Sequence, residues 1–331
     1  MRRIITIEEH LTGVPIGRVL GKYAADDAPY SAMAHEDNRP YSADWYTFGD
    51  MDNLRLRDMD KNGISMQILS CPVKSQLIPS AEAPSVVKES NDYIAEVFKK
   101  HPDRYGAFAM MPWSAPEEAA KEAQRIKSMG FHGVLIAGRA TGGNEFLDSK
   151  KFYPVLEACE ESDLPIYIHP GAPLKAVQEP YYGNIRDEIS ARLSLHGWGW
   201  HNEAGIQVIR MILSGVFERF SKLQIIAGHW GEMVPFFLSR LDQSMPQIVT
   251  KLNRTVTETF RQNVYVTPSG IFDYPQLKFC VEVLGADRII HSVDCPFIGN
   301  EGALPFIENA PLAEDDKENI AHLNAERLFK I

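Results

Sequence analysis

The chain alternates short apolar runs with longer amphipathic stretches. The runs have the length of buried strands, and apolar residues recur at helical spacing in most of the stretches that follow. Eight such alternations predict a parallel (β/α)8 barrel forming one domain over residues 1–331. A doubly wound open sheet is the alternative, disfavoured because no GxGxxG follows any run. The predicted strands are Ile4–Glu8, Ser65–Ser70, Tyr105–Met110, Gly133–Ala137, Pro165–His169, Leu223–Gly228, Val264–Thr267 and Arg288–Asp294. The predicted helices are Asn53–Lys61, Ser85–Lys100, Pro116–Met129, Phe152–Glu161, Ala204–Phe220, Val234–Leu252, Tyr274–Leu284 and Pro305–Phe329.

Two long excursions interrupt this alternation. A barrel of this kind needs about 250 residues, so roughly 80 are in excess. They fall in Leu11–Asp50, after the first strand, and in Gly171–Trp200, after the fifth. Both leave carboxyl ends of strands, where long loops are lids or subunit contacts, and the pattern leaves these two roles open. The Gly-rich stretch Gly138–Asn144 lacks the lysine of a phosphate-binding loop and is interpreted as a flexible loop.

The first predicted strand ends in Glu8-Glu9-His10. Side chains of a strand alternate between its two faces, so Glu8 and His10 are expected to point one way and Glu9 the other. A carboxylate and an imidazole on one face suit a single divalent metal ion.

Three later strands also end in potential ligands, namely His169, His229 and Asp294. The carboxyl ends of barrel strands meet on one face, so these side chains are expected to converge with those of the first strand. Imidazole with carboxylate suits Zn²⁺ or Mn²⁺ with a position left open for substrate or water. One histidine at a strand end is more often a cap or core residue, but four such strand ends are hard to explain that way.

The remaining histidines singled out are interpreted as ordinary. His291 differs in parity from Asp294 and is therefore expected to face the surrounding helices. No GxSxG, HExxH or EF-hand pattern is present. The other ordinary histidines are His132, His196, His201 and His322.

The charge and cysteine content of the chain limit the kinds of partner and the cell compartment that it is expected to have. A net charge of −10 and a pI near 5.5 disfavour nucleic acid or an anionic membrane as the main partner. A local arginine pair or metal still accommodates an anionic small molecule. The four cysteines lie far apart without a CxxC pair, which favours a reduced, cytoplasmic protein. No apolar run approaches the ~20 residues of a membrane span, and the first one is too short for a signal peptide.

Several segments together resemble the metal-dependent, nonoxidative decarboxylase branch of the amidohydrolase superfamily. That branch includes the γ-resorcylate, 2,3-dihydroxybenzoate, 5-carboxyvanillate and aminocarboxymuconate-semialdehyde decarboxylases. Its members commonly begin with His-x-His, whereas Glu8-Glu9-His10 is similar to the hydroxybenzoate enzymes. The segments carrying the resemblance are Ile209–Phe217, Lys222–Glu232, Ser239–Asp242, Ser292–Phe297 and a second-strand block with Arg55-Leu56, Asp58-Met59-Asp60, Gly63-Ile64 and Gln67–Ser70.

The resemblance implies a carboxy-lyase of aromatic compound catabolism, acting on a small aromatic carboxylate and assembling as a homodimer or homotetramer. Arg55 and Arg240 match positions that meet the substrate's carboxylate or ring oxygen, and Phe297 matches an aromatic pocket position. The catalytic groups it implies are His229 and Asp294. The metal ligands it implies are Glu8, His10, His169 and Asp294.

The residues also support a mechanism for an ortho-hydroxybenzoate. A divalent ion would lower the phenol's pKa and fix its orientation. Asp294 is the expected donor of a proton to the ring carbon bearing the carboxylate, and His229 is expected to hydrogen-bond the substrate. Glu232 either orients His229 or is a first-turn helix residue favoured by the helix dipole.

Two other function classes remain open. A metal-dependent hydrolase of an amide, ester or lactone would use the same ligands, with Asp294 as general base toward water. A non-catalytic, metal-stabilised binding protein is disfavoured because the arginines and His229 lie beyond the ligand set.

Overall fold

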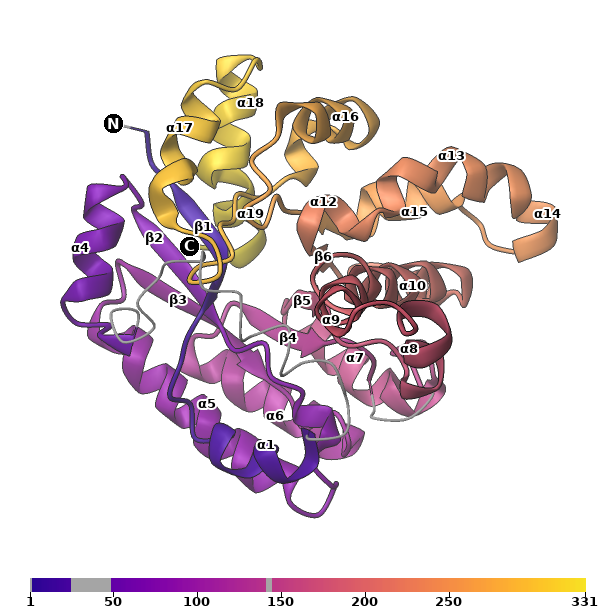
Figure 1. The fold of residues 1–331 in the computed structure, drawn as a ribbon, viewed down its shortest axis with the longest axis horizontal. Coiled ribbons are helices and arrows are strands. Elements are labelled where there is room, and N and C mark those ends of the chain that lie inside the picture. The colour runs from indigo at the N-terminus through magenta and orange to yellow at the C-terminus, as the bar shows by residue number, and fades with distance from the viewer. Residues whose placement is uncertain (1, 25–48, 141–144) are drawn as a thin grey trace.

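The computed structural model describes residues 2–24, 49–140 and 145–331. Seven parallel strands form one curled sheet whose order follows the chain from β1 to β7 (Figure 1). This sequential order confirms the predicted parallel α/β fold and excludes the doubly wound alternative, in which the strand order reverses. The strands are β1 (Ile5–His10), β2 (Met66–Ser70), β3 (Tyr105–Met110), β4 (Gly133–Ala137), β5 (Ile166–His169), β6 (Ile225–Ala227) and β7 (Val264–Val266).

The eighth predicted strand, Arg288–Asp294, is present only as two isolated bridges. Ile289 pairs with Val266 of β7, and Ser292 pairs with Ile7 of β1, both in parallel. The segment therefore lies between the first and last strands of the sheet. A regular strand cannot continue through Asp294, whose φ of 68° is left-handed.

Helices cover the outside of the sheet, and several predicted ones are divided. The predicted helix 204–220 ends at Leu213, because Gly215 takes a left-handed φ of 77° before a short second helix. Pro246 likewise separates two helices within 234–252. The helices that follow strands are α4 (Leu54–Lys61), α5 (Ala83–Lys100), α6 (Pro116–Met129), α7 (Tyr153–Glu161), α10 (Gly199–Leu213), α11 (Val216–Arg219), α12 (Gly228–Glu232), α13 (Val234–Ser244), α14 (Gln247–Thr250), α15 (Val256–Asn263), α16 (Tyr274–Leu284), α17 (Ala303–Glu308), α18 (Glu314–Glu318) and α19 (Asn324–Phe329).

The core has an outer layer between sheet and helices and an inner cluster within the curl of the sheet. The inner cluster includes Ile7, Phe108 and Tyr167, whose side chains point inward from their strands. Phe329 of α19 packs edge-on against Phe108, with ring centroids 5.6 Å apart, and also contacts His132, just before β4. Apolar side chains thus fill the amino-terminal end, and the carboxyl-terminal end is left for polar chemistry.

The two excursions contain helices of their own. Within Leu11–Asp50, the described part includes α1 (Gly17–Ala24), and residues 25–48 lie outside the described residues. Within Gly171–Trp200 lie α8 (Lys175–Tyr182) and α9 (Asp187–Ser194). The predicted flexible loop Gly138–Asn144 falls mostly outside the described residues. In the parts of the chain that are described, we find no helix with the length and apolarity of a membrane span.

Candidate metal centre and active site

The structure brings together the four residues expected to bind metal. Glu8 and His10 come from β1, His169 from the end of β5, and Asp294 from the segment beside β1. One potential ligand atom from each lies within 4.8 Å of the others. His10 Nε2 is 2.9 Å from Asp294 Oδ1, and His169 Nε2 is 3.6 Å from Glu8 Oε1. Residues nearly 290 positions apart in sequence therefore form one cluster at the carboxyl ends of the strands.

A β-bulge explains how Glu8 and His10 both reach this cluster. The pairing of β1 with β2 shifts register between Ile7 and Glu9, and Glu8 has a φ of 68°. Regular alternation was the predicted reason, and the observed reason is this extra residue. Glu9 points elsewhere, as predicted, and its carboxylate accepts hydrogen bonds from the backbone of the Asp294 segment.

Both histidines of the cluster are held in the form that binds metal. His169 Nδ1 donates to the Pro170 carbonyl at 2.8 Å, which leaves Nε2 directed at the cluster as an acceptor. His10 Nδ1 lies 2.8 Å from Ser70 Oγ. Burial lowers the pKa of His10 to about 3 and that of His169 well below its usual value. Both imidazoles are therefore neutral near pH 7, as ligation requires.

The carboxylates show that the cluster is suited to a cation. Glu8 is fully buried, and its Oε2 accepts a hydrogen bond from Ser269. Its Oε1 has no hydrogen-bond partner among the described residues. Burial raises the pKa of both Glu8 and Asp294, because it disfavours the negatively charged form of each carboxylate when no cation is bound. Two carboxylates and two neutral imidazoles, with one buried oxygen unsatisfied, fit one divalent ion.

His229 lies beside the cluster in a second group that includes Glu232 and His201. The short helix α12, in which His229 and Trp230 have left-handed φ values, turns the chain sharply after β6. His229 Nδ1 is 2.9 Å from Glu232 Oε1, and His201 Nδ1 is 2.7 Å from Glu232 Oε2. One buried carboxylate is thus shared by two imidazoles.

Charge pairing dominates this second group. Burial opposes ionisation of Glu232, but the adjacent His229 and His201 outweigh it and lower the pKa of Glu232. Burial also disfavours the charged forms of both histidines, yet Glu232 raises the pKa of each above its usual value. Of the two interpretations of Glu232, these contacts favour the one in which it orients His229.

His201 was wrongly interpreted as ordinary from the sequence. It lies on α10, directly after the second excursion, where no strand end marks it. In the structure its Nε2 lies 3.0 Å from Trp200 Nε1 and 3.0 Å from the His196 carbonyl oxygen. His291, by contrast, faces outward as predicted: its Nε2 contacts the Ala303 carbonyl, and its ring stacks on Phe306 of α17.

The predicted substrate residues have three different placements. Phe297 lies at the cluster, its ring edge-on to His10 with centroids 5.4 Å apart. Arg55 is fully buried on α4, and it donates to Gln67 Oε1 at 2.7 Å and to the His10 carbonyl at 2.8 Å. Arg240 lies exposed on α13. The role of each toward substrate stays a prediction.

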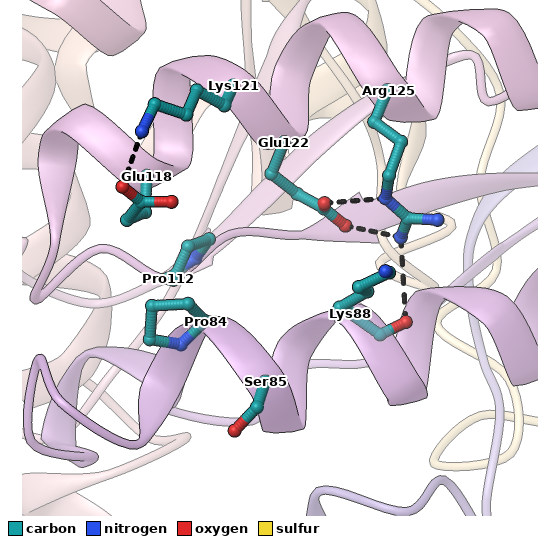
Figure 2. A pocket seen from close by; sticks show the side chains of 8 residues that line it. All are labelled: Pro84, Ser85, Lys88, Pro112, Glu118, Lys121, Glu122 and Arg125. Atoms are coloured by element: carbon teal, nitrogen blue, oxygen red, sulfur yellow. Dashed lines mark hydrogen bonds and ion pairs between the residues drawn. The ribbon is translucent and has the colours of Figure 1, made fainter.

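A hollow of about 260 Å³ between α5 and α6 contains none of the ligating residues (Figure 2). Its Glu122 and Arg125 are joined by two hydrogen bonds of 2.7 Å, and Lys121 pairs with Glu118. Four of the five charged side chains around this hollow are therefore paired with one another, and we place the chemistry at the strand ends.

Comparison with known proteins agrees with this placement. Residues 55–331 match the amidohydrolase family. The chain is 33% identical over 293 residues to a γ-resorcylate decarboxylase of Polaromonas sp., covering 85% of this chain and 88% of that one. A Polaromonas dihydroxybenzoic acid decarboxylase solved with manganese and 2-nitroresorcinol has a TM-score of 0.84 at 30% identity, covering 100% of this chain and 97% of that one.

A 5-carboxyvanillate decarboxylase from Novosphingobium aromaticivorans, complexed with manganese and 4-hydroxy-3-methoxy-5-nitrobenzoic acid, has a TM-score of 0.88 at 28% identity. It covers 100% of this chain, which covers 96% of it in turn. The resemblance seen in the sequence is thereby confirmed: this chain belongs to the amidohydrolase family, in its branch of metal-dependent decarboxylases.

Proposed function

We propose that this chain is a metal-dependent, nonoxidative decarboxylase of a hydroxylated aromatic carboxylic acid, with its hydroxyl ortho to the carboxylate. The observation that carries the proposal is the cluster of Glu8, His10, His169 and Asp294, with the His229–Glu232 pair beside it. Two of the solved relatives hold a nitrophenol or a hydroxylated nitrobenzoate, which fits this substrate class.

We infer that one divalent ion is held by Glu8, His10, His169 and Asp294. When bound, it supplies a positive charge that lowers the pKa of the substrate's phenol and fixes the ring. Manganese is the favoured ion because the relatives contain it. Zinc is the second candidate on donor chemistry alone.

Asp294 is the proposed acid. In the metal-free protein burial raises the pKa of Asp294, and an anionic substrate beside it would favour the protonated form by like-charge repulsion, so Asp294 is the group proposed to deliver a proton to the ring carbon that carries the carboxylate. Once that carbon is protonated, the bond to the carboxylate breaks, CO₂ leaves, and the bonding electrons restore the aromatic ring. Asp294 then takes a proton from solvent, so no oxidant or reductant is consumed.

His229 is the proposed hydrogen-bond partner of the substrate's carboxylate or phenolate. Because Nδ1 is engaged by Glu232, Nε2 is the nitrogen left to face the substrate. The ring of Phe297 lies beside His10 and is proposed to form one wall of the substrate pocket. Arg55 and Arg240 are proposed to bind the substrate's carboxylate or ring oxygen.

We also propose a homodimer or homotetramer built from a single-domain (β/α)8 barrel. Large apolar side chains are exposed on α13 and α14, which extend to one side in Figure 1. These side chains are Phe236, Phe237, Ile248 and Val249. Arg240 lies on α13. The two excursions are proposed to act as lids or as subunit contacts, and a cytoplasmic location stays a prediction.

The decisive experiment is turnover of an ortho-hydroxybenzoate panel in D₂O by manganese-loaded protein. Decarboxylation places deuterium on the carbon that carried the carboxylate and releases CO₂ without added oxidant or nicotinamide. A hydrolase would leave every carbon–carbon bond intact. Metal-dependent hydrolysis of amides, esters or lactones, with no CO₂ from any hydroxybenzoate, would overturn the proposal.

A further inference from the structure

The backbone ladder between β1 and the Asp294 segment is interrupted where both carry ligands. Before the interruption, the Ile7 N–H donates to the His291 carbonyl at 3.1 Å. After it, the His10 N–H donates to the Cys295 carbonyl at 2.6 Å. Between these two bonds lie Glu8 and Asp294, each with a left-handed φ of 68°.

The side chain of Glu9 fills this gap. Its Oε1 accepts the Val293 N–H at 3.0 Å, and its Oε2 accepts the Cys295 N–H at 3.2 Å. These two N–H groups belong to the residues on either side of Asp294. Glu9 is fully buried, and its carboxylate makes the bonds that the ladder lacks at this point.

We propose that Glu9 is a positioning residue that holds Asp294 in its left-handed conformation and so turns the Asp294 carboxylate toward His10. The inference rests on the proposed function, since the purpose it assigns to Asp294 is metal binding and proton donation. Glu9 itself does not contact the metal or the substrate. A non-glycine residue in this conformation is strained and persists only when its surroundings hold it.

A carboxylate is suited to this position because each of its oxygens accepts one N–H. Burial raises the pKa of Glu9 to about 8, and the charge of Arg55 and the two backbone N–H groups act in the opposite direction, toward the ionised form. In a Glu9→Gln variant, one oxygen would be replaced by an NH₂ group facing a peptide N–H, so one of the two bonds is lost. A Glu9→Asp variant keeps both acceptor oxygens, but its side chain is one methylene shorter and is expected to fall short of the two N–H groups.

The main test is the affinity of the purified full chain for Mn²⁺, measured by titration and followed by the EPR spectrum of the bound ion. Glu9→Gln is expected to weaken binding roughly 10- to 100-fold and to change the spectrum, as loss of a supporting partner does in other metal sites. Glu122→Gln is the matched control, a buried carboxylate bonded to Asn91 and Arg125, and its affinity should equal that of the unmodified chain.

Hydrogen exchange of the metal-free, unmodified chain gives a second test that needs no variant to fold. The amides of Val293 and Cys295 should be protected, because Glu9 binds them without metal. Unchanged Mn²⁺ affinity and spectrum in folded Glu9→Gln, or rapid exchange of both amides, would overturn the positioning role. If the unmodified chain binds no divalent ion while both amides are protected, the proposed function fails, and the purpose assigned to Glu9 fails with it.

Discussion

His201 and His229 lie with ring centroids 4.4 Å apart, and each directs its Nδ1 to a different oxygen of Glu232. The two rings therefore fix the same carboxylate from two sides. Since Glu232 in turn orients His229, removing His201 is expected to affect a residue that it does not bond.

A His201→Asn variant is predicted to lower kcat roughly tenfold or more while retaining metal. In other metalloenzymes, removing a residue that orients an active-site side chain has an effect of this size. The measurement is steady-state kinetics on the best hydroxybenzoate, with metal content determined on the same sample. His101→Asn is the control, since His101 pairs with Asp52 at the surface. Unaltered kcat in the His201 variant would show that Glu232 needs only one histidine.

Metal dependence is tested most directly at His169. Its Nδ1 is fixed on the Pro170 carbonyl, so the His169→Ala change removes a ligand that the structure has already oriented. Metal content by mass spectrometry and activity should both be lost, and chelation followed by Mn²⁺ should restore activity only in the unmodified chain. A full metal complement with a normal rate in His169→Ala would rule out the assigned centre.

Arg240 is predicted to bind substrate through a bidentate contact that lysine cannot reproduce. Arg240→Lys should raise KM or lower kcat about tenfold or more without loss of metal. Arg210→Lys, whose parent side chain pairs with Asp148 at the surface, is the control. Parent-like kinetics in Arg240→Lys would assign this residue to the surface of α13 alone.

The stability of the metal-free protein is predicted to depend on His291 below neutral pH. Burial lowers the pKa of His291 to about 4, whereas the unfolded residue titrates near 6.5. Between these values the unfolded state binds the additional proton, so the free energy of unfolding falls as pH falls through this window. The full effect of this shift is roughly 3–4 kcal/mol. His291→Gln should flatten this part of a denaturation series between pH 7 and pH 4, and an identical slope in the variant would contradict the assignment.

Most strands could be predicted because buried parallel strands are nearly continuous apolar runs bounded by turn residues. The same logic located His169, His229 and Asp294, since strand ends of a barrel share one face. The eighth strand was harder: its pattern is apolar, but the left-handed Asp294 that ends its pairing leaves no mark in the hydrophobic periodicity.

The remaining differences have physical causes that act across the chain. His201 on α10 bonds Glu232 on α12, and a contact between two separate elements follows no fixed spacing in the sequence. The helix ends at Leu213 and Ser244 depend on Gly215 and Pro246, and apolar residues recur beyond each of them, so the hydrophobic pattern does not mark the break. The direction of Glu9 was predicted, but its partners lie 284 and 286 residues away.

The bulge at Glu8 makes the identity of the metal ligand depend on the number of residues in β1. Deleting one residue between Ile7 and His10 would restore a regular pleat and place a single glutamate opposite Leu69. That one carboxylate would have to serve either the cluster or the Val293 and Cys295 amides, since it cannot reach both. The metal centre should therefore fix the length of this short stretch of β1 as strictly as it fixes the identities of Glu8 and Glu9.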